Sequence, residues 1–308
     1  MCRFTLEMCR FAPGIFVAGG RGAGMVRRSL LYCPGDDREM MEKAVETAAD
    51  AVIFDLEDAV VPDAKAEARR TVRSMLDSLD DPAPDVTVRI NPYGRSGPED
   101  VDAVVGEADS PPDGVVLPKV NGAEPVEALF ERLGRLTNEP VGIVPLIETA
   151  AGVVAVDEIA AASGVDAVAF GDQDFTADIG ATVTDDKTES LYARQRVVVA
   201  AAAAGVDAFD TVYTDIRDLD GLREQAEFAA EIGFDGKLAV HPDQIPEING
   251  AFTPGADQLE WAETVLAERE RAEEAGAGAF TVDGQMIDPP LIERAETVIE
   301  RAEAAGIR

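Results

Sequence analysis

Short apolar runs alternate along the chain with longer stretches in which apolar residues recur every three or four positions. The short runs have the length of buried strands, and the longer stretches have the period of amphipathic helices. The runs lie at residues 29–33, 51–55, 86–90, 114–117, 141–146, 167–170, 208–212 and 237–240. The helical stretches between them lie at 38–49, 64–79, 125–136, 153–162, 190–204 and 221–232. This alternation predicts repeated βα units and a parallel sheet.

The eight strand-like runs favour a (β/α)8 TIM barrel of the α/β class over an open Rossmann sheet, and no G-x-G-x-x-G motif follows the first run. The tail beyond residue 240 is surplus to such a barrel. It carries helical patterns at 258–274 and 290–304, a Gly-rich segment at 275–279 and a hairpin-like segment at 280–287. We therefore expect a catalytic barrel at 25–255 and a C-terminal helical extension at 256–308. The extension either covers the base of the barrel or reaches a neighbouring subunit.

The first residues of the chain stand apart from this pattern. Residues 1–24 precede the first strand-like run and lack the apolar core and cleavage site of a secretory signal. Met25 stands just before that run, so we expect translation to begin there and residues 1–24 to be a disordered or misassigned extension. No stretch of the chain approaches the roughly 18 apolar residues that span a bilayer.

The acidic composition indicates where the protein works. The chain has 60 Asp and Glu against 27 Lys and Arg, which gives a formal charge of −33, and lysine occurs only five times. Self-repulsion on this scale weakens a fold in dilute buffer, whereas molar salt shortens the Debye length to roughly 3 Å. We therefore expect a cytoplasmic protein in the high-salt cytosol of a halophile, the alternative being an acidic protein of an ordinary cell. Nucleic acid and anionic membranes are not expected as partners, because both are negative.

Polar residues follow the apolar runs at the positions that meet at the mouth of a barrel, where barrel enzymes carry out their chemistry. In order along the chain they are Asp55, Glu57, Asp58, Arg89, Asn91, Lys119, Glu148, Asp172, Gln173, Asp174, Asp210 and His241. Converging carboxylates repel one another unless a cation bridges them, and oxygen ligands favour Mg2+ or Mn2+. Zinc is not expected, because Cys2, Cys9 and Cys33 with a single histidine form no zinc set.

Several of these carboxylates have a structural alternative. Asp55, Asp172 and Asp210 can instead cap the helix that follows each strand. Glu148 is the stronger candidate for a metal ligand, because it ends a very apolar run and precedes small residues that let a ligand or backbone approach closely. Spacing alone does not choose between Asp172 and Asp174.

The basic residues also leave two readings open. Arg89 is costly to bury without an anionic partner, so it pairs with Glu57 or Asp58, or holds a substrate oxygen, or does both. Lys119 and His241 are expected either beside the substrate or in a structural role.

A series of motifs runs in order from residue 28 to residue 289. They are RSLLYCPG at 28–35, FDLEDAV at 54–60, VRIN at 88–91, LPK at 117–119, IETA at 147–150, GDQD at 171–174, VHPDQI at 240–245 and MIDP at 286–289. Together they resemble the citrate lyase β-subunit-like and malyl-CoA lyase branch of the HpcH/HpaI aldolase family.

This resemblance implies a retro-Claisen or aldol-type lyase in which Glu148 and Asp174 hold Mg2+ (or Mn2+) and bind the substrate, which favours Asp174 over Asp172. Further substrate contacts are expected from Gln173, Lys119 and His241. For coenzyme A, the expected contacts are Tyr32, Arg38 and Lys43.

The resemblance also implies catalytic roles. Arg89 is expected to contact the substrate near its thioester, while Glu57 and Asp58 support metal-bound water and that arginine. Asp288 matches a residue that relatives insert, with their C-terminal segment, into the active site of an adjacent subunit. A homo-oligomer, either a trimer or a hexamer, is therefore expected.

The implied reaction cleaves or forms a 3-hydroxyacyl-CoA thioester. Malyl-CoA or β-methylmalyl-CoA would give glyoxylate with acetyl-CoA or propionyl-CoA. The alternatives are a citryl-CoA or citramalyl-CoA lyase, a CoA-independent hydroxy-oxo-acid aldolase, and a non-catalytic barrel. The C-terminal segment 287–289 argues against the CoA-independent aldolase.

Overall fold

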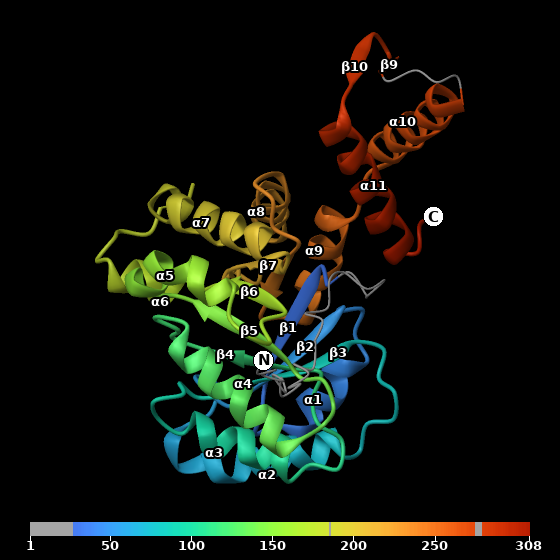
Figure 1. Ribbon diagram of the computed structural model, residues 1–308. Helices are drawn as coiled ribbons and strands as arrows, with labels where there is room; N and C mark the ends of the chain where they lie inside the picture. Colours follow the sequence, from blue (N-terminus) through green and yellow to red (C-terminus); the bar gives the residue numbers. More distant parts are fainter. Residues whose placement is uncertain (1–26, 185, 275–278) are drawn as a thin grey trace, which may run out of the picture.

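The computed structural model describes residues 27–184, 186–274 and 279–308. Its centre is a closed barrel of eight parallel strands in sequence order, with the last strand pairing back onto the first (Figure 1). The strands are β1 (Ser29–Pro34), β2 (Ala51–Asp55), β3 (Asp85–Arg89), β4 (Gly114–Leu117), β5 (Gly142–Ile147), β6 (Ala167–Phe170), β7 (Asp207–Asp210) and β8 (Gly236–Ala239). The predicted (β/α)8 barrel is confirmed, whereas the expected N-terminal extension, residues 1–24, lies outside the described residues.

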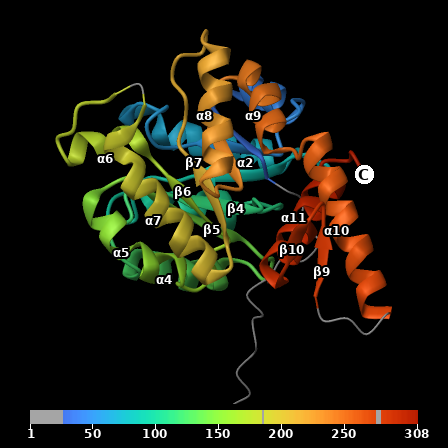
Figure 2. The ribbon, with the colours of Figure 1, turned by 90° about the horizontal axis from the view of Figure 1, so that it is seen from above.

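Helices surround the strands and form the outer layer (Figure 2). They are α1 (Arg38–Val45), η1 (Pro62–Ala64), α2 (Lys65–Leu76), α3 (Gly97–Val101), η2 (Asp102–Gly106), α4 (Glu124–Leu136), α5 (Ala150–Ala160), α6 (Asp172–Asp178), α7 (Thr188–Ala204), α8 (Leu219–Glu231), η3 (Pro242–Gln244) and α9 (Ile245–Phe252). The sequence pattern missed the short helices α3, α6 and α9, which have five to eight residues and offer at most about two turns in which an apolar face could repeat. Within the described ranges, no helix is both long and apolar enough to cross a bilayer.

The alternation of side chains along each strand separates two apolar cores. In β2, Ala51 and Ile53 belong to the cluster inside the barrel, while Val52 and Phe54 belong to the larger cluster between the strands and the helices. Asp55 continues the inner series, so its carboxylate belongs to the interior of the barrel at its mouth.

After α9 the chain forms a smaller unit from α10 (Ala256–Glu274), the antiparallel strands β9 (Phe280–Val282) and β10 (Gln285–Ile287), and α11 (Pro289–Ala304). This unit has an apolar core of its own and stands to one side of the barrel (Figures 1 and 2). Arg301 of α11 donates a hydrogen bond to Asp235, which lies just before β8. The unit is therefore tied to the end of the barrel where the strands begin, opposite the mouth.

A buried charge network joins β7, β8 and α7. Arg194 donates to the two carboxylate oxygens of Asp210 at 2.9 and 3.0 Å, and Lys237 Nζ donates to Asp210 Oδ2 at 2.5 Å. Burial alone would raise the pKa of Asp210, but Lys237 and Arg194 lower it below its ordinary value. Phe209 faces the barrel interior, so the next side chain, Asp210, points outward to the helices. Asp210 is thus neither a helix cap nor part of the mouth, contrary to expectation.

The Asp210→Asn variant should lose about 3–5 kcal/mol of unfolding free energy, because Arg194 and Lys237 would remain buried without their anion. Chemical denaturation measures this loss. The matched control Asp220→Asn removes an exposed carboxylate that pairs with Arg223, and its unfolding midpoint should stay near that of the wild type. Equal midpoints for the two variants would contradict the role given to the network.

Candidate active site

Carboxylates from separate strand ends gather at the mouth of the barrel. Asp55 is the last residue of β2, Glu57 lies two residues further on, and Glu148 directly follows β5. All three are at most 5% exposed. Carboxylates buried so close together require positive partners, which come from β3 and from the loop after β4.

Arg89, the last residue of β3, is the first of these partners and stands in register with Asp55. Its Nε and Nη2 donate to Asp55 Oδ1 and Oδ2 at 2.7 and 2.6 Å. Its Nη1 lies 3.3 Å from Glu57 Oε2, its Nη2 lies 3.9 Å from Asp58 Oδ2, and its guanidinium carbon lies 4.7 Å from the ring centre of Tyr32. The expected ion pairs with Glu57 and Asp58 are therefore present, but the sequence interpretation missed Asp55, the partner with the shortest contacts.

Asp55 also orders the loop that carries Glu57. Its Oδ1 accepts from the Glu57 N–H at 2.8 Å and its Oδ2 accepts from the Ala59 N–H at 3.0 Å. Lys65 Nζ closes the same loop by donating to the carbonyl oxygens of Leu56 and Glu57. Asp55 therefore orders a loop and orients Arg89, but it does not cap the helix after β2, contrary to the structural alternative considered for it, because the N-cap residues of η1 and α2 are Val61 and Ala64.

Lys119, in the loop after β4, is the second cation of the mouth. Its backbone is left-handed, with φ of 55°, a conformation that costs a residue with a side chain roughly 1–2 kcal/mol. In this conformation its N–H donates to Glu148 Oε1 at 2.7 Å. Its Nζ lies 2.9 Å from Asp174 Oδ2, 3.0 Å from Glu57 Oε1 and 3.9 Å from Glu148 Oε1. One ammonium group therefore bridges three carboxylates from different strand ends.

Negative charge still exceeds positive charge at this point of the mouth. Burial raises the pKa of Glu148 to about 7, an effect that Lys119 opposes and that the charges of Glu57 and Asp174 strengthen. Burial also raises the pKa of Glu57 above its ordinary value, against the lowering influence of Arg89 and Lys119. An additional cation would therefore stabilise the ionised carboxylates.

Asp172 and Asp174, which spacing could not distinguish, have different partners. Asp174 is held by Lys119, whereas Asp172 Oδ2 lies 2.9 Å from Lys187 Nζ, a residue that the sequence interpretation did not consider. The Asp172 side chain does not cap α6, whose N-cap residue is Gly171. A Cβ at Gly171 would lie 2.7 Å from the Cβ of Glu148, so only glycine leaves room for that side chain.

A cavity of about 130 Å3 opens at the mouth, and its lining includes Tyr32, Arg89, Glu148, Gln173 and Asp174. Asp58 and Asp172 line it as well. The Tyr32 hydroxyl and Asp172 Oδ1 are buried and have no hydrogen-bond partner within the described structure, and the same holds for Glu57 Oε2. Buried polar atoms without partners indicate a place for a polar ligand, an ion or water.

The carboxylate oxygens at this cavity suit a hard divalent cation such as Mg2+ or Mn2+, which prefers oxygen ligands. Glu148 and Asp174 are the residues that could hold it. In the described part of the chain, no group of three or more His, Cys, Asp or Glu side chains is arranged to hold a metal ion. Water and substrate would then complete the coordination, which is common for Mg2+.

The residues expected to bind coenzyme A lie in two places. Tyr32 lines the cavity, but Arg38 and Lys43 lie on the exposed side of α1. Arg38 donates to Glu42 at 2.8 Å, to Ser74 of α2 and to Ser78 just beyond that helix, and Lys43 donates to Glu39 at 2.6 Å. Both cations are therefore engaged by the chain itself, and their contact with coenzyme A stays a prediction.

His241 and Asp288 both lie at the starts of helices. The Nδ1 atom of His241 accepts from the Asp243 N–H at 3.2 Å, which is the structural role considered for it. Asp288 caps α11 and accepts from the Leu291 N–H at 3.4 Å. Because the far end of α11 is tied to the opposite end of the barrel, the structure does not join Asp288 to the carboxylates of its own subunit. Its role in a neighbouring active site stays a prediction.

Comparison with known proteins identifies the family of this chain. Residues 28–242 match the family described as HpcH/HpaI aldolase/citrate lyase. The chain belongs to this family. Membership in the HpcH/HpaI family confirms the resemblance inferred from the motifs and the enzyme class, a carbon–carbon lyase.

Relatives of this HpcH/HpaI lyase span most of its length. It is 38% identical over 291 residues to the mitochondrial citramalyl-CoA lyase of Mus musculus, covering 90% of this chain and 86% of the relative. It is 35% identical over 290 residues to the citrate lyase subunit beta of Leuconostoc mesenteroides subsp. cremoris, covering 91% and 94%. Its fold is similar, with a TM-score of 0.74 and 35% identity, to the CitE protein of Mycobacterium tuberculosis in complex with magnesium, acetoacetate and coenzyme A, covering 90% and 98%.

Glu148→Gln should change how the stability of this lyase depends on pH. Glu148 ionises near its ordinary value in the unfolded chain but at a pKa of about 7 in the fold, so between these values the folded state keeps a proton that the unfolded state has lost. Stability therefore falls as pH rises through this window. Glutamine stays neutral, so the variant should be more stable than the wild type above about pH 7, by an amount on the order of 3 kcal/mol.

Urea unfolding at fixed ionic strength, with chelator present and at several pH values from about 4 to 8, measures the difference. The advantage of Glu148→Gln should vanish near the acidic end. Glu67→Gln, which replaces an exposed acid paired with Arg70, is the control and should show no such trend. A difference that is constant across this range would show that the Glu148 carboxylate is not perturbed.

Proposed function

We propose that the chain is a Mg2+-dependent lyase that cleaves, or forms, a short 3-hydroxyacyl-CoA thioester. The observation that supports this most is the Lys119 ammonium bridging Glu57, Glu148 and Asp174 beside Arg89, because it gathers metal-ligating and oxyanion-binding groups at one mouth. The relative crystallised with magnesium, acetoacetate and coenzyme A supports the same ligands here.

Citramalyl-CoA is the favoured substrate, with pyruvate and acetyl-CoA as products. The 38% identity to a citramalyl-CoA lyase over 90% of the chain moves this substrate ahead of malyl-CoA and β-methylmalyl-CoA, which the sequence interpretation placed first. A citryl thioester is the second candidate, and the similarity to citrate lyase subunit beta supports it.

Each residue of the mouth has a role in this reaction. Glu148 and Asp174 would hold the divalent cation, which supplies the positive charge that acidifies the 3-hydroxyl group of the substrate. The hydroxyl would give its proton to water at the mouth, the carbon–carbon bond would break, and the hydroxyl carbon would become the ketone of a 2-oxoacid. Arg89, already fixed by Asp55, stabilises the oxyanion of the thioester enolate that receives the bonding electrons.

A different residue would protonate the enolate. The enolate carbon must gain a proton to give the acyl-CoA product, and Asp288 of a neighbouring subunit would supply it. Glu57 and Asp58 flank Arg89 and would position it and the water around the cation. Gln173 lines the same cavity, and Lys119 lies within reach of a substrate carboxylate there.

The purified protein in buffer of high KCl with Mg2+ should release pyruvate from citramalyl-CoA, detected as its phenylhydrazone. Malyl-CoA and β-methylmalyl-CoA, tested separately, would yield glyoxylate. Asp174→Asn should lower turnover more than about a hundredfold and weaken Mn2+ binding, because even residues that only support a metal ligand cost 10–100-fold. The control Asp220→Asn, which removes an exposed carboxylate from the first turn of α8, should match the wild type. Folded, metal-bound protein that cleaves none of these thioesters would overturn the proposal.

Asp288 can be tested by subunit mixing. Asp288→Asn and Glu148→Gln should each be inactive, yet co-expression of the two chains should restore activity. If each site combines one barrel with the C-terminal unit of its neighbour, random mixing leaves about a quarter of the sites with both intact groups. Sites built within one chain would remain inactive in the mixture. The same preparation, analysed by light scattering, tests the proposed trimer or hexamer.

The proposed setting is a cytosol of high salt. The net charge of −33 supports it, because screening by concentrated salt removes most of the self-repulsion.

A further inference from the structure

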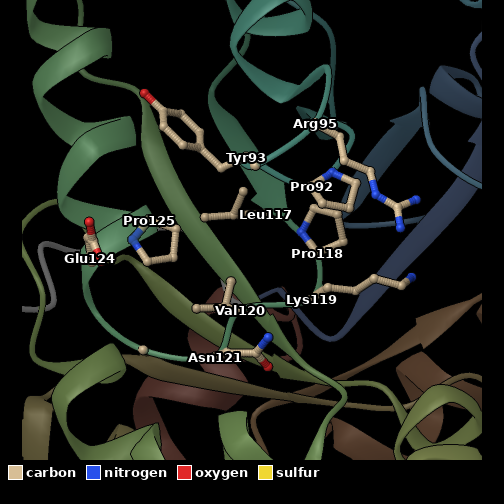
Figure 3. Close-up of a pocket in the computed structure, with 12 residues that line it drawn as sticks. Pro92, Tyr93, Arg95, Leu117, Pro118, Lys119, Val120, Asn121, Glu124 and Pro125 are labelled. Atoms are coloured by element: carbon tan, nitrogen blue, oxygen red, sulfur yellow. The ribbon is translucent and has the colours of Figure 1, made fainter.

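A second, larger cavity of about 510 Å3 lies between the loops that follow β3 and β4 (Figure 3). Its walls are largely apolar and include Pro92, Tyr93, Leu117, Pro118 and Val120. This volume lies within the range of about 300–1,000 Å3 that small-molecule sites occupy. The cavity is therefore large enough to hold part of an organic ligand.

Lys119 connects this cavity to the carboxylates of the mouth. It lines the cavity, and its Nζ also lies 2.9 Å from Asp174 and 3.0 Å from Glu57. A ligand whose reacting end lies beside Glu148 and Asp174 could therefore extend past Lys119 into this space.

Arg95 supplies a positive charge to this largely apolar cavity. In Figure 3 the side chains of Arg95 and Lys119 extend toward the same side, while Glu124, the carboxylate among the lining residues, lies on the other side. The Arg95 side chain is exposed and has no hydrogen bond or ion pair with any of the described residues. Most of the other described arginines pair with a carboxylate, so an unpaired guanidinium at a cavity is available for an anion from solution.

The unpaired Arg95 guanidinium matters because the protein as a whole is strongly negative. A protein of charge −33 repels an anionic substrate, so binding requires local cations. Arg38 and Lys43, the cations expected for coenzyme A, are engaged by Glu42 and Glu39. Among the described residues, no carboxylate pairs with the Arg95 side chain in this way.

We propose that this cavity is a second subsite for the thioester substrate and that Arg95 binds an anionic group of that substrate. The subsite rests on the proposed lyase function. The anionic group is either a phosphate of the coenzyme A part or a carboxylate of the acyl part. Both groups accept paired hydrogen bonds from a guanidinium.

The test compares Arg95→Gln with Arg217→Gln. Arg217, in the loop between β7 and α8, is an exposed arginine whose guanidinium likewise has no hydrogen bond or ion pair with the described residues, so its removal changes the net charge equally. It lines neither cavity. Calorimetric titration at fixed KCl with Mg2+ measures the binding of coenzyme A and, separately, of malate to each variant, and thermal melting confirms that both remain folded.

Arg95→Gln should bind one of these probes about five- to tenfold more weakly than the wild type, while Arg217→Gln binds both nearly as the wild type does. Weaker binding of coenzyme A alone assigns Arg95 to a phosphate, and weaker binding of malate alone assigns it to an acyl carboxylate. Equal binding by the two variants for both probes would overturn the subsite.

Steady-state kinetics separates the subsite from the lyase proposal. If the wild type cleaves a thioester and Arg95→Gln has the same KM as Arg217→Gln, the subsite fails and the lyase stands. If no thioester is cleaved but Arg95→Gln still binds coenzyme A or malate more weakly, the lyase fails and the anion site stands.

Discussion

Charge balance at the mouth of the barrel is the constraint on which the rest of the site depends. Asp55, Glu57 and Glu148 are nearly inaccessible to solvent, so they can lie together only where positive groups are held among them. Arg89 is held in place by strand register, and Lys119 by a left-handed loop. Both cations are therefore placed by the backbone, and the carboxylate cluster is as well defined as the barrel itself.

The sequence predicted the barrel well because the signals were local. The strands are short, mostly apolar and bounded by turn residues, and even the hairpin at 280–287 was visible in this way. It also predicted that residues after the strands would converge, and Arg89, Lys119 and Glu148 do meet at the mouth. That result follows from topology, since all carboxyl ends of a parallel barrel face one way.

Pairings that depend on register or on which way a side chain points were not predictable from one sequence. Asp55 lies opposite Arg89 because β2 and β3 pair at that register, and the sequences of the two strands do not reveal the register. Asp210 follows an apolar run and was therefore expected at the mouth. Because side chains alternate along β7, it instead points outward to Arg194 and Lys237. Lys187 reaches Asp172 from the start of another helix, a contact with no sequence spacing to reveal it.

The placement of the five lysines has a chemical consequence for a protein that handles activated acyl groups. Lys65, Lys119, Lys187 and Lys237 are each turned toward carbonyls or carboxylates of the fold, whereas the Lys43 side chain is 68% exposed. Thioesters slowly acylate free amines, and lysine is the side chain that receives such groups. With four of its five lysines bonded to buried or partly buried groups of the fold, the described part of the surface offers an electrophilic substrate few lysine amines to modify.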